Sequence, residues 1–259
     1  MNAPPAIELR GLTKRFGDTL ALDHVDLVVR PGAVFGFLGR NGAGKTTALR
    51  ILSGLARPTE GTAHVLGHDV TGATDAVRAQ IGFLPDVPGF YPWMTAREYL
   101  DFAGQLFALD RTTIDERANA LLEMAGLASV TTRVGSFSRG MKQRLGIAQA
   151  LINAPSLLML DEPLVGLDPR GIRTLFGTLR RHAGSGRAVV MSSHLLGQIE
   201  PHCTRFLILR SGAKLFHGSK TEIAAMLPAM RHDASLEEIF FGATEASEPA
   251  EPDVAAGHR

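Results

Sequence analysis

The chain has 259 residues, a formal net charge of +1 and 20% charged residues, less than the usual share of about a quarter. Acidic and basic residues nearly balance and no long lysine and arginine run occurs, which argues against nucleic-acid binding. The single cysteine, Cys203, excludes a disulfide within the chain and fits a reducing cytosol. The first residues lack a signal-peptide layout, and no apolar run approaches the roughly 18 residues of a membrane span, so we expect a soluble chain.

Three segments near the N-terminus predict a partly exposed antiparallel sheet. Apolar and polar residues alternate in residues 7–12 (IELRGL), 24–29 (HVDLVV) and 61–67 (GTAHVLG), as in strands with one buried face. The dipeptide at residues 31–32 (PG) favours a turn that joins the second segment to the strand after it.

Four apolar runs without alternation predict strands that are buried on both faces. They are residues 34–39 (VFGFLG), 157–161 (LLMLD), 188–193 (AVVMSS) and 206–210 (FLILR). Strands of this kind belong to parallel sheets that are covered by helices. We therefore expect an α/β fold with a mostly parallel sheet.

Residues from about 90 to 155 predict three consecutive helices with no strand between them. Capping-box spacings begin the first two, at residues 95–98 (TARE) and 113–116 (TIDE), and Gly126 ends the second. Residues 137–151 form the third, which stops shortly before a proline. We expect these helices to form an α-helical subdomain that is inserted in the α/β core.

The C-terminal part predicts a hairpin, two short helices and a tail. A turn is favoured at residues 211–212 (SG), and residues 219–222 (SKTE) and 235–238 (SLEE) have capping-box spacing. The chain after about Ala243 is rich in Ala, Glu and Pro without an apolar period. We expect one domain over residues 1–242 and a disordered tail over residues 243–259.

Residues 39–46 (GRNGAGKT) match the complete P-loop pattern between a predicted strand and a predicted helix. Glycines let backbone N–H groups surround phosphate oxygens, and the helix that begins near Lys45 points its positive end at them. Lys45 is placed to reach the β- and γ-phosphates, Thr46 to ligate Mg²⁺ and Thr47 to hydrogen-bond the α-phosphate. The alternative is a chance glycine-rich turn. The expected phosphate-binding residues are Gly39, Asn41, Gly42, Gly44, Lys45, Thr46 and Thr47.

Asp161 and Glu162 follow a predicted buried strand at its carboxyl end, where α/β sheets bind ligands. Asp161 is suited to hold the water shell of Mg²⁺, and Glu162 to polarise an attacking water. Alone, the two residues would suggest an ordinary turn before Pro163, but with the P-loop they complete a nucleotide triphosphatase. An NKxD-type guanine motif and a kinase motif set are absent, so ATP is favoured over GTP.

A second anion site is predicted where Ser138 and Gly140 precede a basic helical run. Together the motifs make the chain resemble, over about residues 6–242, the ATP-binding subunit of an ABC transporter. The stretch FSRGMKQ stands where that family has its signature sequence, residues 166–169 (GLDP) match its D-loop, and residues 192–196 (SSHLL) contain its switch histidine. The resemblance implies a P-loop NTPase core with ATP and Mg²⁺ as cofactors.

The resemblance also assigns roles to individual residues. Phe16 occupies the position of the aromatic that stacks on adenine, with a phenylalanine in the sheet core as the alternative. His194 would donate to a γ-phosphate oxygen and sense its loss, with a structural histidine as the alternative. Glu162 and His194 are the implied catalytic residues. Two copies would pair head to tail, so that the signature of one copy binds the nucleotide on the P-loop of the other. The implied residues at this shared nucleotide are Ser138, Gly140, Met141 and Asp168.

Three departures from the family pattern point to one branch of it. Asp86 stands where the family has its Q-loop glutamine, Arg139 replaces a signature glycine and Met141 replaces the signature glutamine. Asp86 can bind Mg²⁺ through water but cannot donate an amide hydrogen bond. Together these features resemble exporters with membrane subunits of the ABC-2 type. Residues 86–97, with their aromatic stretch, are the expected permease docking groove; packing of those aromatics within the helical subdomain is the alternative.

We therefore expect an ATPase at the cytoplasmic face of the cell membrane that drives a separate permease and binds no nucleic acid. It would act as a homodimer, with a heterodimer as the alternative. A soluble regulatory or translation-type ABC ATPase is a second possibility, but such chains usually carry two cassettes and this one has a single P-loop. A non-enzymatic nucleotide-binding module is a third, which Glu162 and His194 disfavour.

Overall fold

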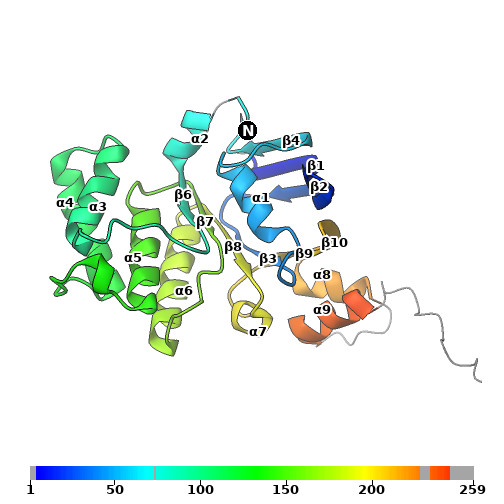
Figure 1. Cartoon of the computed structure of the whole chain (residues 1–259). Helices are drawn as coiled ribbons and strands as arrows, with labels where there is room; N and C mark the ends of the chain where they lie inside the picture. The colour runs from blue at the N-terminus through cyan, green and yellow to red at the C-terminus, as the bar shows by residue number, and fades with distance from the viewer. Residues whose placement is uncertain (1–3, 73, 228–233, 246–259) are drawn as a thin grey trace, which may run out of the picture.

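The computed structural model describes residues 4–72, 74–227 and 234–245 (Figure 1). The strands are β1 (Ile7–Phe16), β2 (Thr19–Val29), β3 (Val34–Leu38), β4 (Glu60–Val65), β5 (His68–Asp69), β6 (Ile81–Leu84), β7 (Leu157–Leu160), β8 (Ala188–Ser193), β9 (Arg205–Arg210) and β10 (Ala213–Gly218). The helices are α1 (Lys45–Leu52), α2 (Thr74–Gln80), α3 (Ala96–Leu106), α4 (Arg111–Ala125), α5 (Arg139–Leu151), α6 (Pro169–Gly184), α7 (Leu196–Ile199), α8 (Lys220–Ala225) and α9 (Leu236–Glu245), with a 3₁₀ turn η1 (Val134–Ser136).

The strands form one sheet in the order β5-β4-β1-β2-β10-β9-β3-β8-β7-β6. β9, β3, β8, β7 and β6 pair in parallel, whereas β2, β1, β4 and β5 pair antiparallel. Every residue of β3, β7 and β8 is buried, as expected of strands covered on both faces. The predicted α/β fold with a mostly parallel sheet and an N-terminal antiparallel part is confirmed. The strand β6, which is only four residues long, was not predicted.

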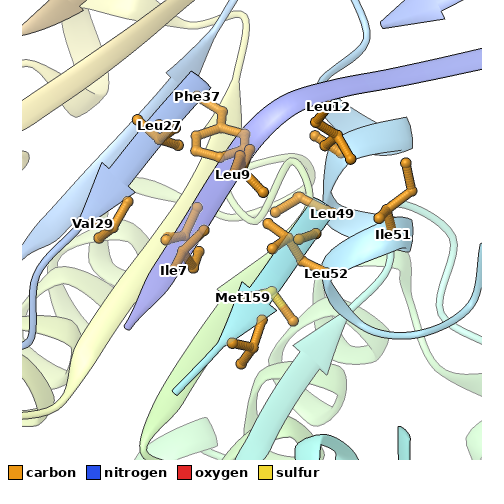
Figure 2. Close-up of a cluster of buried hydrophobic side chains, with 14 of the residues drawn as sticks. Ile7, Leu9, Leu12, Leu27, Val29, Phe37, Leu49, Ile51, Leu52 and Met159 are labelled. Atoms are coloured by element: carbon orange, nitrogen blue, oxygen red, sulfur yellow. The ribbon is translucent and has the colours of Figure 1, made fainter. Parts of the chain in front are cut away.

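A large apolar core joins the antiparallel strands to the parallel ones (Figure 2). Side chains of β1 and β2 meet Phe37 of β3, Met159 of β7 and one face of α1. The residues labelled in this core are Ile7, Leu9, Leu12, Leu27, Val29, Phe37, Leu49, Ile51, Leu52 and Met159. Because α1 follows β3 directly, this packing fixes the loop between them from both sides.

The helices α3, α4 and α5 pack around a separate apolar core at one end of the molecule (Figure 1). Thr95 begins α3 with the predicted capping box: its hydroxyl accepts from the Glu98 N–H, and the Glu98 carboxylate accepts from the Thr95 N–H at 2.8 Å. The box predicted at Thr113 is wrong. Asp110 caps α4 instead and accepts from the Thr113 N–H at 2.8 Å, because its carboxylate lies three residues earlier and leaves Thr113 inside the first turn.

The C-terminal part follows the sequence pattern closely. The hairpin of β9 and β10 is confirmed, and Ser219 begins α8 with a capping box. Ser235 and Glu238 exchange the same pair of hydrogen bonds at the start of α9. The helix α9 ends at Glu245, and the predicted domain boundary at residue 242 falls within its last turn. Residues 246–259, most of the predicted tail, lie outside the described part. In the described ranges, no helix is long and apolar enough to cross a bilayer.

Gly82 provides a test of how β6 holds the helical subdomain against the sheet. A Cβ at this position would lie 1.8 Å from the backbone oxygen of Ala150 in α5 and 2.9 Å from Pro155. We expect Gly82→Ala to lower the free energy of unfolding by about 3 kcal/mol, because backbone must move to admit the methyl group. Urea denaturation measures the change.

Gly184 at the end of α6 is the matched control, because a Cβ there would meet no atom within 4 Å. Gly184→Ala should change the free energy of unfolding by at most about 1 kcal/mol, and in the stabilising direction. Equal urea midpoints for Gly82→Ala and wild type would contradict the close packing of β6 on α5.

Candidate nucleotide-binding site

The loop between β3 and α1 needs glycine at positions where other chain segments approach it. A Cβ on Gly39 would lie 2.6 Å from the backbone oxygen of Leu209, and one on Gly44 would lie 2.5 Å from that of Ala21. Gly44, with a φ of 103°, is also the N-cap of α1. The loop is therefore clamped between β9 and β2 at its base, while Asn41 and Gly42 at its tip are exposed.

Lys45 is the first residue of α1, and its side chain turns back along the loop. The ammonium group is buried and donates to the backbone oxygens of Gly39 at 2.7 Å and Arg40 at 3.2 Å. It also lies 3.6 Å from the Glu162 carboxylate. Thr46 and Thr47 follow in the first turn and are half-buried. A positive charge thus lies within the loop at the N-terminus of α1, where phosphate oxygens can bind.

Asp161 leaves β7 as a fully buried carboxylate with one free oxygen. Its Oδ1 accepts from the hydroxyl of Ser192 in β8 at 2.5 Å, while its Oδ2 is buried and has no hydrogen-bond partner. The same hydroxyl accepts from the Glu162 N–H at 2.9 Å. An unpartnered carboxylate oxygen next to a phosphate loop fits a hydrated Mg²⁺, which binds through one or two carboxylates and keeps several waters.

Glu162 connects the P-loop to the end of β8. Its side chain is only 11% exposed; Oε1 faces Lys45, and Oε2 lies 2.8 Å from Nδ1 of His194, which is 44% exposed. The backbone of Glu162 has a φ of 49°, a strained conformation of the kind that gathers at functional sites. Gln143 of α5 donates to the backbone oxygens of Glu162 and Pro163 at 3.4 and 3.1 Å and supports this turn.

The residues predicted for a partner's nucleotide form a second, separate group. Ser138 caps α5 and accepts from the Met141 N–H at 3.2 Å, and Asp168 caps α6. Both line a cavity of about 890 Å³ together with Gly140 and Gly166, whose backbones touch closely enough that a Cβ on Gly140 would lie 2.6 Å from the Gly166 oxygen. No residue of the P-loop lines this cavity in the described chain. One copy therefore does not bring the two predicted anion sites into one cavity.

The remaining predicted residues are at the surface. Phe16 ends β1 and is 53% exposed, with the Lys14 ammonium 4.7 Å from its ring centre, so the alternative that it packs in the sheet core is wrong. Asp86 is exposed in the turn after β6. Trp93 is 58% exposed, and its ring centre lies 5.2 Å from that of Tyr91.

Two supporting residues, Ser192 and Gln143, were missed by the sequence analysis. Ser192 stood within a quoted motif, but its partners Asp161 and Glu162 are about thirty residues away in the chain, so no local pattern revealed the contact. Gln143 is buried in α5 although its side chain is polar. A polar residue on the buried face of a predicted helix was its only signal in the sequence.

A strand, a glycine-rich loop and a helix, with two carboxylates leaving a nearby parallel strand, define a P-loop nucleotide-binding protein. Residues 22–165 match the family described as ABC transporter. The chain belongs to the ABC transporter family and corresponds to its ATP-binding subunit, as predicted.

Three curated relatives cover most of the chain. Nod factor export ATP-binding protein I of Cupriavidus metallidurans is 36% identical over 218 residues, which is 84% of this chain and 72% of the relative. Bacitracin transport ATP-binding protein BcrA of Bacillus licheniformis is 41% identical over 212 residues, 81% of this chain and 68% of the relative. Daunorubicin resistance ATP-binding protein DrrA3 of Streptomyces coeruleorubidus is 38% identical over 237 residues, which is 91% of this chain and 75% of the relative.

Two solved structures share the fold. One, an ATP-binding subunit of an ABC transporter, has a TM-score of 0.87 and 29% identity, and the match covers 92% of this chain and 99% of that one. The other is a dimeric, post-hydrolysis ATP-binding cassette bound to ADP and Pi, with a TM-score of 0.74 and 26% identity. That match covers 82% of this chain and 98% of the other.

Ser192→Ala tests the buried hydrogen bonds between β7 and β8. It leaves Asp161 Oδ1 and the Glu162 N–H without their partner, and a buried unsatisfied group costs about 1–3 kcal/mol. We expect the free energy of unfolding, measured in urea without nucleotide, to fall by about 2 kcal/mol.

The control is Ser136→Ala, which removes an exposed hydroxyl that donates to the Arg133 oxygen. That change should stay within about 0.5 kcal/mol. If Ser192→Ala were as stable as wild type, Ser192 would not hold the two carboxylate-bearing residues in place.

Proposed function

We propose that the chain binds and hydrolyses ATP and drives a membrane exporter of the ABC-2 type as one half of a head-to-tail ATPase dimer. The observation that carries the proposal is the contact of Glu162 with both Lys45 and His194, at 3.6 and 2.8 Å. A potential base thus lies between a phosphate-binding cation and a second group that can contact the γ-phosphate. The names of the relatives, which concern export, transport and drug resistance, support the exporter class.

In this proposal the nucleotide lies along the start of α1. The exposed ring of Phe16 stacks on adenine, a contact of about 1–3 kcal/mol by analogy with other base–aromatic pairs. The phosphate oxygens would accept hydrogen bonds from the backbone N–H groups of residues 39–47. Mg²⁺ would be held by Thr46, by the free oxygen of Asp161 and, through water, by Asp86. When it is bound, the ion neutralises phosphate charge.

Glu162 must be released by its two present partners before it can act as the base. Its two oxygens face Lys45 and His194, so these two partners must turn to the γ-phosphate before the carboxylate can accept a proton from water. ATP binding provides the competing negative charge. In this proposal the exchange of partners makes the base available when the triphosphate is in place.

The second anion site completes the proposal. Ser138, Gly140 and Asp168 would meet the nucleotide of a second copy, because the cavity that they line is separate from the P-loop of their own chain. Met141, whose N–H is capped by Ser138, would lie beside them. Closure of two such sites on two ATP molecules would hold the dimer together until hydrolysis. The segment of residues 86–97, which exposes Tyr91 and Trp93, would contact the permease at the cytoplasmic face of the membrane.

Glu162→Gln tests the role of the base. The amide keeps the size of the side chain but cannot accept the proton, so we expect steady-state phosphate release to fall about 10³-fold, roughly 4 kcal/mol of barrier. ATP binding should persist, and ATP should produce a stable dimer on a sizing column.

Glu116→Gln is the control, because Glu116 is an exposed carboxylate of α4. It should hydrolyse ATP at the wild-type rate. Near-normal turnover of Glu162→Gln would mean that the base lies elsewhere.

The head-to-tail arrangement is tested by cross-linking. In a Glu162→Gln background, cysteines replace Arg40, next to the P-loop tip, and Arg139, beside Ser138; the two positions line different cavities. With Mg-ATP, a short bis-maleimide should give a covalent dimer on a denaturing gel, and much less without nucleotide.

Native Cys203 can stay in this experiment, because burial raises the pKa of its thiol to about 12 and keeps it protonated. Each single-cysteine variant serves as a control and should remain mostly monomeric. Efficient linkage within one chain, without an ATP-dependent dimer band, would exclude the composite site.

A further inference from the structure

The switch histidine lies between β8, a buried strand that ends at Ser193, and the short helix α7. His194 is exposed and is followed by α7, a helix of four residues whose N-cap, Leu195, makes no side-chain cap hydrogen bond. Isolated helices shorter than about 12–15 residues are marginal in water, so α7 depends on tertiary contacts. On the other side of His194, the Ser193 hydroxyl at the end of β8 accepts from the Leu195 N–H at 2.9 Å, so the segment is held from both β8 and α7.

Glu200, at the end of α7, joins three elements through one carboxylate. Its Oε1 lies 2.5 Å from the ammonium of Lys220 in α8, and its Oε2 accepts from the backbone N–H of Leu236, at the start of α9, at 2.8 Å. The side chain is only 19% exposed. Its negative charge also lies at the positive end of α9, which is a favourable position.

A second group of contacts holds the other end of α7 to α9. The Gly197 N–H points at Oε1 of Glu237 at 3.4 Å, and a Cβ on Gly197 would lie 3.3 Å from the same oxygen. Leu196 and Ile199 share an apolar core with Leu236 and Ile239. The helix following the histidine is therefore packed on the C-terminal helices along its whole length.

The helix α9 also reaches the phosphate loop. Phe240 lines a cavity of about 340 Å³ together with Arg40, Asn41, Gly42 and Ala43. One helix thus packs on α7 and faces the tip of the P-loop across this cavity. These are the two segments that would bind the γ-phosphate from different sides. A displacement of α9 would change their relative position.

We propose that Glu200 is a positioning residue for ATP hydrolysis. By tying α7 to α8 and α9, its carboxylate holds His194 where it can reach Glu162 and, by extension, the γ-phosphate. This inference rests on the proposed function. It assigns the C-terminal helices a part in the catalytic step, although none of their residues touches Lys45, Asp161 or Glu162 in the hydrogen bonds and ion pairs of the described chain.

The test compares Glu200→Ala, Glu200→Gln and Arg205→Ala in the full chain. Glu200→Ala should lower kcat for ATP hydrolysis about tenfold and leave KM within twofold, because small misplacements of a catalytic group cost up to about 10²-fold while the P-loop stays intact. Glu200→Gln keeps an oxygen that can accept from Leu236, so its kcat should lie between those of Glu200→Ala and wild type. Arg205→Ala breaks the 2.9 Å ion pair between β9 and Glu222 of α8, leaves Glu200 untouched, and should retain wild-type kcat.

A second measurement separates positioning from a general loss of structure. In a His194→Ala background, Glu200→Ala should have no further effect on the residual turnover, because it acts through the missing side chain. Should Glu200→Ala fail to fold, the same comparison is made with Glu200→Gln. Unchanged kcat, a raised KM alone, or an equal loss with and without His194 would each overturn the inference. A wild-type chain that does not hydrolyse ATP would instead overturn the proposed function.

Discussion

The ion pair between Lys45 and Glu162 is the interaction on which the arrangement of the site depends. A buried ammonium is costly unless charges and hydrogen bonds surround it, and here two backbone oxygens of the loop and the Glu162 carboxylate do so. The pair joins the loop after β3 to the turn after β7, and His194 extends it to the end of β8. Three neighbouring parallel strands thus deliver their carboxyl ends to one point, as α/β sheets do.

The proposed exchange of partners at Glu162 needs few new contacts. The side chains that contact the Glu162 carboxylate in the described chain are Lys45 and His194, and an ammonium or an imidazole N–H can donate to a phosphate oxygen as well as to a carboxylate. In the proposed function, the same two side chains would therefore exchange one anion for another. Lys45 is already buried in the fold without nucleotide, so ATP binding does not have to remove it from water.

Two features outside the phosphate loop bear on the proposed conformational cycle. Ser138 at the start of α5 and Asp168 before α6 line one cavity. In the proposed dimer, the helical subdomain and the core must therefore be correctly oriented before a second copy can bind there. The C-terminal helices lie at the opposite side, where α9 packs on α7. Coupling through packed elements of this kind requires two discrete arrangements, for which the contacts of Glu162 and Glu200 are the candidates.

The sequence by itself determined the features that rest on short-range chemistry. The P-loop of residues 39–46, the four apolar runs of the parallel sheet and the capping box at Thr95 depend on neighbouring residues, so their patterns were sufficient. The tertiary structure alone decided between Asp110 and Thr113 as a cap, since both residue types suit that role and only the backbone entering α4 selects one. It also revealed the contacts of Ser192 and Glu200, whose partners lie 20 to 36 residues away in the chain. Contacts of that range exist only once the sheet has brought distant strand ends together, and no local pattern encodes them.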